Sequence, residues 1–288
     1  MGRPAALATG AAPRQVAPMP SPQDPAGPDL PGTDLPGLAG FARKHDPDRF
    51  LCALFAPAER RETVFTLIAF NHELARAREA AREPMMALIR LQWWRDTVEE
   101  ALAGAAPRRH EVAGPLSAAI REGWLDPAAL LAMVEGREAE ETGEDAVPLV
   151  ERMRGTSGVM AAETGRVLGA GEDVMAALRQ VGTAYGIAGT LRSLAVLAAQ
   201  GRDPWPPHAE PREAARLLAR DGLSLLEAGR RGLAGLPARA VAAALPGVLA
   251  RRDLRRVLAA GWDPALAPTP RGLGDRLAVA WAGLRGRA

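Results

Sequence analysis

Two segments of the chain carry residues at the spacing of a single helix face, and chemistry is expected there. In residues 61–79 and 181–207, positions three and four apart lie above one another if each segment is helical. The first face combines an amide, an imidazole and one carboxylate with smaller side chains: Ile68, Asn71, His72, Ala75 and Glu79. The second face is mainly glycine: Gly182, Gly186, Gly189, Ser193 and Leu197. Paired carboxylates at this spacing would hold a divalent metal ion, but the two faces together offer only one.

Both segments resemble the signature helices of the squalene/phytoene synthase family. Members carry a Tyr-Ala-Phe-Cys-Arg opening followed by an Asp-rich D-x-x-x-D motif. Later they carry an Asn-x-x-Arg-Asp run, a second D-x-x-x-D motif and a Gly-Arg-x-Tyr-Leu-Pro ending. The resemblance runs from about residue 41 to the C-terminus. Its flanking matches are Phe50, residues 54–57, Arg61, Ala69-Phe70, residues 91–96, Leu191-Arg192, Gly201-Arg202 and Pro206.

The resemblance fails at the metal ligands. In the family, the two Asp-rich helices face each other across a cavity and hold Mg²⁺, which grips a prenyl diphosphate and stabilises the departing pyrophosphate. In this chain Ala75 and then Arg76 stand at the first motif, where Glu79 keeps one carboxylate. Ser193 and Leu197 replace both aspartates of the second motif. The resemblance therefore implies no catalytic residue, no metal site and no cofactor.

Other positions of the family's site leave two interpretations each. His72 stands where the family has an arginine, and it is either a hydrogen-bonded inward residue or a ligand. Gly186 and Gly189 replace a glutamine and an asparagine, and this glycine seam either lets two helices approach closely or shapes a groove for a lipid tail or partner helix. Arg192 and Arg202 serve ion pairs and helix ends, or form a residual anion site.

The elements that would position these residues are all helices. Apolar positions recur at helical spacing, and neither alternating strand patterns nor Asn-Gly hairpin signals occur. The expected helices span residues 48–55, 57–81, 85–103, 114–122, 126–142, 146–168, 172–200, 211–233, 238–259 and 273–284. Trp93 and Trp94 are expected to anchor helix contacts in the core. The fold class is all-α, and the resemblance implies one large isoprenoid-synthase-like bundle with a central cavity.

Composition excludes several classes of protein. Hydrophobic residues make up 48% of the 288 residues and the net charge is +2, which is typical of a globular protein. Lys44 is the only lysine, and the arginines alternate with acidic residues, so we expect solvated helix faces and no nucleic-acid partner. Cys52 is the single cysteine, which rules out a disulfide framework within the chain.

The chain divides into a tail and a domain. Residues 1–36 are rich in proline, alanine and glycine without an apolar face, so we expect a disordered tail, although a targeting segment is an alternative reading. Residues 37–288 form the predicted helical domain. No run of 18 uncharged apolar residues occurs, so no transmembrane segment is expected.

Within the family, one branch combines the same losses with a similar opening. The phytoene-synthase-like assembly factors of respiratory complex I, the NADH:ubiquinone oxidoreductase, also read Ala-Phe-Asn-x-Glu-Leu, as residues 69–74 do here, and share the run at residues 90–94. This implies a non-catalytic role with a complex I subunit or assembly partner, in the cytoplasm or peripherally at the inner membrane surface. The alternatives are a prenyltransferase that uses Mg²⁺ with altered ligands and a carrier of isoprenoids or lipids.

Overall fold

The computed structural model describes residues 37–79, 84–141, 148–202, 204–205 and 209–288. All of them belong to the compact unit Leu35–Ala288. The segment 1–36, which the sequence predicts to be a disordered tail, lies outside the described residues. Its boundary with the helical domain stays a prediction.

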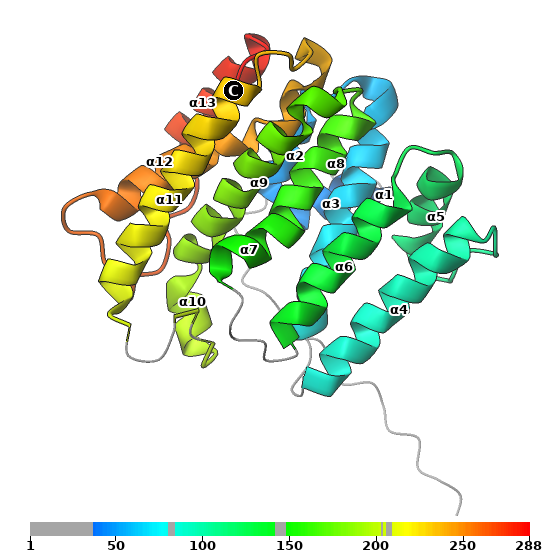
Figure 1. Ribbon diagram of the computed structural model, residues 1–288, viewed down its shortest axis with the longest axis horizontal. Helices are drawn as coiled ribbons and strands as arrows, with labels where there is room; N and C mark the ends of the chain where they lie inside the picture. The colour runs from blue at the N-terminus through cyan, green and yellow to red at the C-terminus, as the bar shows by residue number, and fades with distance from the viewer. Residues whose placement is uncertain (1–36, 80–83, 142–147, 203, 206–208) are drawn as a thin grey trace, which may run out of the picture. The chain divides into compact units, whose positions relative to one another are not determined.

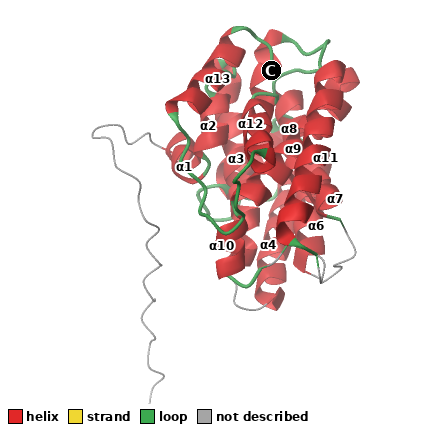
Figure 2. Ribbon diagram, turned by 90° about the vertical axis from the view of Figure 1, so that its left-hand side faces the viewer, coloured by secondary structure: helices red, strands yellow, loops and turns green. Residues whose placement is uncertain are grey.

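Every regular element among the described residues is helical, which confirms the predicted all-α class (Figure 1 and Figure 2). The elements are α1 (Gly37–His45), α2 (Pro47–Ala53), α3 (Ala58–Glu79), α4 (Pro84–Leu102), α5 (Ala113–Arg121), α6 (Pro127–Glu141), α7 (Leu149–Met153), η1 (Arg154–Gly158), α8 (Val159–Val167), α9 (Glu172–Arg192), α10 (Leu194–Ala199), α11 (Pro211–Gly232), η2 (Ala238–Ala243), α12 (Pro246–Leu258) and α13 (Leu273–Leu284). None of these helices has both the length and the apolar character needed to cross a bilayer.

Helix α3 forms the centre of one half of the core. Its residues 64–71 are all buried, so this stretch is covered on every side by α1, α2, α4, α5, α6 and α8. Trp94 of α4 is only 4% exposed, and its ring meets that of Phe70 edge to face at 5.6 Å. This confirms the prediction that Trp94 is a core anchor. The core therefore holds the first predicted face in place.

Helix α9 is the centre of the other half, between α8, α11 and α12 (Figure 1). It also packs closely on η1. A Cβ at position 182 would collide with the backbone oxygen of Ser157, and it would lie 2.5 Å from the Cβ of Ala161. Only glycine permits this approach, which offsets its low helix propensity.

Two of the predicted helices are interrupted by local backbone chemistry. The predicted helix 172–200 is broken at Ser193, whose N–H is shared between the oxygens of Gly189 (3.1 Å) and Thr190 (3.0 Å), so α9 ends there and α10 begins. The predicted helix 238–259 is divided at Pro246, which lacks an N–H and therefore begins α12 after the 3₁₀ turn η2.

The predicted helix 146–168 is also divided. Its middle widens into the π-helical turn η1, whose sequence is Arg-Gly-Thr-Ser-Gly. A π turn inserts one extra residue into a helix, and the two glycines weaken the ordinary helical pattern. The hydroxyl of Thr156 donates to the oxygen of Arg152 at 2.9 Å. Helical periodicity alone did not predict this change.

Candidate functional site

The interior of the bundle holds a cavity of about 30 Å³. It lies between α2, α3, α8, α9 and η2, and Ile68 of the first face and Gly182 of the second line it. Such a volume holds one or two water molecules at most. The predicted central cavity of the fold is therefore almost filled by side chains.

The polar groups in the cavity wall are paired or neutral. The guanidinium of Arg49 lies 2.7 Å from Asp46 and 4.6 Å from the ring centre of Tyr185. Burial lowers the pKa of Arg49, but Asp46 and Tyr185 more than offset this, so its pKa is raised. Burial raises the pKa of Tyr185 and of Cys52 well above their ordinary values. At neutral pH the phenol and thiol stay protonated, so neither is poised as a base.

The amide and the imidazole of the first face lie near the middle of α3. Asn71 is buried, and no described residue donates a hydrogen bond to its Oδ1. His72 is half-buried and packs with two rings of α1, 4.5 Å from His45 and 5.4 Å from Phe41 between ring centres. Ala75 is half-buried one turn further along. His72, which has no histidine partner nearby in the sequence, therefore gains one through the fold.

The charged residues at the end of α3 do not form an acidic site. Arg76 is exposed, and its guanidinium lies 3.6 Å from the carboxylate of Glu73. Glu79 is the last residue of α3, and its side chain lies outside the described residues. Glu73, which the sequence analysis did not single out, is the described carboxylate of this stretch.

The glycine seam of α9 has two different environments. A Cβ at Gly186 would lie 2.8 Å from the sulfur of Met153 and 2.9 Å from Ser157, so this glycine allows close packing on α7 and η1. Gly189 is exposed, and a Cβ there would meet nothing within 4 Å. Ser193 and Leu197 follow as half-buried residues. The close-approach reading holds for Gly186 and does not hold for Gly189.

The two retained arginines are engaged within the protein. Arg192 lies 3.3 Å from Asp253 and donates to the backbone oxygen of Thr269 at 3.2 Å. The N–H of Arg202 donates to the oxygen of Leu197 at 2.9 Å, directly after Gly201 with its φ of 67°. This pattern closes a helix end. The ion pair of Arg192 agrees with the structural reading of that side chain, whereas the bond of Arg202 involves its backbone.

Asp253 is the hub of a buried ion-pair network. This carboxylate is 3% exposed and also lies 2.8 Å from Arg256 and 2.7 Å from Arg271. Arg271 continues to Asp48 of α2 at 2.7 Å. Burial lowers the pKa of Arg271, but the two carboxylates raise it well above its ordinary value. The network joins α2, α9, α12 and the segment before α13, which no sequence motif indicated.

The resemblance to the family predicts that α3 and α9 face each other across a cavity, and the structure places Ile68 of α3 and Gly182 of α9 in the wall of one small cavity. The two helices have no broad contact, and both pack on α8. Met160 of α8 and Ser157 of η1 line the cavity together with Ile68 and Gly182. The turn η1 and the helix α8 therefore occupy the space between the two predicted faces.

The described residues do not fit the Mg²⁺ that the family fold implies. The positions predicted to face a metal carry a methyl group at Ala75, a hydroxyl at Ser193 and an alkyl chain at Leu197. Mg²⁺ requires oxygen ligands in near-octahedral geometry, usually carboxylates. No group of three or more His, Cys, Asp or Glu in the described part of the chain is arranged to hold a metal ion.

A second hollow, of about 280 Å³, lies between α3, α4 and the segment before α5. Glu73, Arg90, Trp93 and His110 are among the residues that line it, and the rings of Trp93 and His110 meet at 5.6 Å. Trp93, predicted from the sequence to anchor helix contacts in the core, packs against the core but is only half-buried, in the wall of this hollow. The tryptophan pair was visible in the sequence, but His110 comes from a loop whose path no periodicity predicts.

Comparison with known proteins identifies a family through much of this region. The model of the family described as squalene/phytoene synthase matches residues 42–209. In solved structures, a dehydrosqualene synthase in complex with ligand superposes with a TM-score of 0.68 at 13% identity, over 86% of this chain and 94% of that chain. At this identity the superposition shows the fold alone.

Curated relatives that match the chain are named as assembly factors. The human protein named NADH dehydrogenase (ubiquinone) complex I, assembly factor 6, is 38% identical over 96 residues, which cover 33% of this chain and 28% of that protein. The mouse protein of the same name is 31% identical over 156 residues, or 52% of this chain and 46% of that protein. The chain thus matches less than half the length of these relatives.

Proposed function

Since the chain belongs to the squalene/phytoene synthase family, we propose that it is a non-catalytic member that acts in the assembly of respiratory complex I. The observation that carries this proposal is the chemistry of the metal-facing positions. Ala75, Ser193 and Leu197 supply no carboxylate there, and a leaving diphosphate in an apolar interior needs its charge neutralised. The similarity to the complex I assembly factors supports the same role.

The size of the interior cavity supports the loss of catalysis. Pockets that bind small molecules have volumes of roughly 300–1,000 Å³. The cavity between α3, α8 and α9 has about 30 Å³, and the ring of Tyr185 and the side chain of Met160 are in its wall. A prenyl diphosphate would need these side chains to move apart.

The proposed partner is a complex I subunit or another assembly factor. The proposed place of action is the cytoplasmic side of the membrane that holds complex I, where the protein binds peripherally. The fold supports this reading because a non-catalytic helical bundle keeps large helix surfaces for partner binding. A prenyltransferase and a lipid carrier are the outcomes against which the proposal is tested.

The test is deletion of the gene in its native organism, with complex I measured on native gels and by NADH:ubiquinone oxidoreductase activity. We expect complex I to decrease and partial assemblies to accumulate, and the wild-type gene to restore it. Lipid extracts of the same strains give the control. Normal complex I together with a changed isoprenoid profile would overturn the proposal in favour of the enzyme or the carrier.

A further inference from the structure

Helix α13 is docked on the domain through one face only. Asp275 and Val279 are buried on that face, and Gly283 lies against the ring of Phe55 so closely that a Cβ would collide with it. Asp275 lies 2.5 Å from Arg252 and 2.6 Å from Arg256 of α12. The helix is therefore held firmly, and its other face is available.

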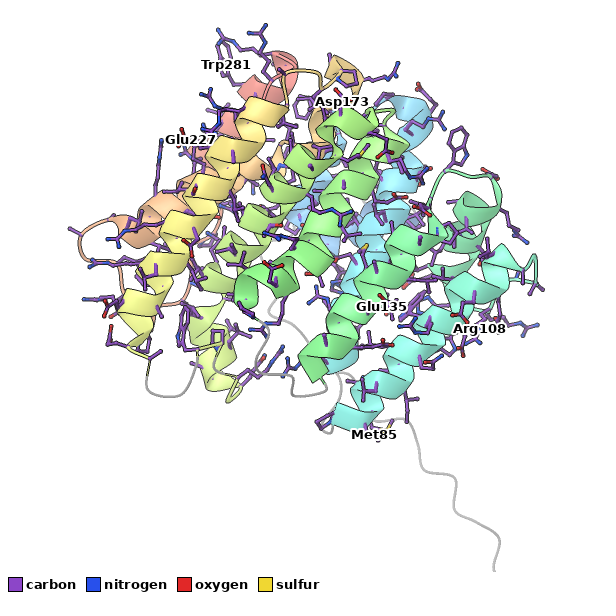
Figure 3. The ribbon with its side chains drawn as sticks, in the orientation of Figure 1. Met85, Arg108, Glu135, Asp173, Glu227 and Trp281 are labelled. Atoms are coloured by element: carbon purple, nitrogen blue, oxygen red, sulfur yellow. The ribbon has the colours of Figure 1, made fainter. Side chains whose placement is uncertain are left out.

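The opposite face of α13 is an exposed apolar stripe. Its large side chains follow one another three or four residues apart, so they lie on one side of the helix. They are Leu273 (73% exposed), Leu277 (58%), Trp281 (61%) and Leu284 (80%). Figure 3 shows Trp281 at the outer edge of the bundle. Contiguous exposure of this kind marks an interaction surface.

The exposed charges of α13 and of the residues that follow it are basic. Arg276, Arg285 and Arg287 are exposed, whereas Asp275, the one acidic residue of α13, is buried in its ion pairs. The guanidinium of Arg285 lies 4.3 Å from the centre of the Trp281 ring. An apolar stripe of leucine and tryptophan with arginines beside it is the pattern of a helix that lies in the headgroup region of a membrane.

We propose that the α13 stripe is the surface by which this protein docks on an anionic lipid bilayer. The leucines and Trp281 enter the boundary between headgroups and acyl chains, and the arginines meet lipid phosphates. The 12-residue helix is about 18 Å long, so it lies flat along the surface. A second copy fits less well, because a symmetric contact would bring these arginines near their own copies.

Vesicle flotation tests the proposal, independently of any role in complex I assembly. The purified full chain is mixed with vesicles of phosphatidylcholine alone or with added phosphatidylglycerol. The test variant is Leu277→Glu/Trp281→Glu. The matched control is Met85→Glu/Ile89→Glu, which adds the same charge at similarly exposed apolar residues of α4 (63% and 54%). Circular dichroism confirms that both variants fold.

We expect wild type and the α4 control to float with the anionic vesicles, and the α13 variant to bind at least tenfold more weakly. Arg276→Gln/Arg285→Gln/Arg287→Gln should lose the preference for phosphatidylglycerol. Wild type that stays off the vesicles, or equal losses in the α13 and α4 variants, would overturn the proposal. So would light scattering that shows a wild-type dimer abolished by the α13 substitutions, because a second copy would then cover the stripe.

Discussion

At the scale of single residues, the buried carboxylate of Asp253 shows that charged side chains in this bundle serve the fold. Asp253 has almost no exposure and faces Arg192, Arg256 and Arg271 from three different parts of the chain. A buried charge is costly unless it is paired, and this carboxylate is paired with all three guanidinium groups. These three arginines therefore stabilise the folded structure through their ion pairs.

Removing that carboxylate should strongly destabilise the protein. In Asp253→Ala, Arg271 loses one of its two partners while only 12% of its side chain is exposed. Breaking a buried pair by removing one partner costs about 3–5 kcal/mol of unfolding free energy. Urea denaturation measures the change. Glu227→Ala is the control, because the ion pair of Glu227 with Arg231 on α11 is solvent-exposed (Figure 3). Equal urea midpoints for the two variants would contradict this account.

The pairing of these arginines also bears on the residual anion site of Arg192 and Arg202, to which His72 and Arg76 would add contacts if it held a prenyl phosphate without metal. Arg192 is paired with Asp253 and Arg76 with Glu73, so we expect no binding by calorimetry with farnesyl or geranylgeranyl phosphate in EDTA. Heat of binding that disappears in both Arg192→Ala and Arg202→Ala would show that the site binds anions after all.

At the scale of elements, two glycines of α9 differ in whether close helix packing requires them. Gly182 and Gly189 lie two turns apart on one helix, but only the first has neighbours that a Cβ would meet. Gly182→Ala should lower the unfolding free energy by about 1–3 kcal/mol through overpacking on Ser157 and Ala161. Gly189→Ala should raise it by about 0.5–1 kcal/mol, since alanine is the better helix former. Thermal melts of both variants check the opposite signs, and two changes of the same sign would be incompatible with this packing.

The attachment of α13 should depend on pH. Although burial raises the pKa of Asp275, hydrogen bonds from Arg256 and Arg252 lower it to about 2. A folded-state pKa below the ordinary value of 3.8 means that the ion pairs stabilise the protein above that value. This stability is lost as the pH falls from about 4 towards 2. Hydrogen exchange across α13 measures the loss. Asp275→Asn should remove this pH dependence, and an unchanged profile in that variant would refute the assignment.

At the scale of the whole molecule, sequence patterns predicted the helical class and the missing carboxylates but did not predict the neighbours of each helix. Periodicity predicted a helix over residues 57–81, where α3 runs from Ala58 to Glu79, but it did not predict that residues 64–71 are covered on every side. It cannot show that α8 and η1 fill the space between α3 and α9. The Asp253 partner of Arg192 lies 61 residues further along the chain, so only the folded chain reveals this pair.

The features on which the proposals depend are thus of two kinds, those visible in the sequence and those visible only in the folded structure. The substitutions Ala75, Ser193 and Leu197 were readable because a resemblance supplied the expected carboxylates. The exposed stripe of α13 and the hollow beside Trp93 could be recognised only from the packing of the folded chain. From the sequence alone, an apolar periodic face is interpreted as core until the structure shows that nothing among the described residues covers it.

The most direct test of a non-catalytic bundle is release of pyrophosphate from farnesyl and geranylgeranyl diphosphate by the purified protein in Mg²⁺ or Mn²⁺. With no carboxylate at Ala75, Ser193 and Leu197 and an interior cavity of about 30 Å³, we predict release no faster than in the control without protein. Metal-dependent release above that control, accompanied by a condensed prenyl product, would contradict the account.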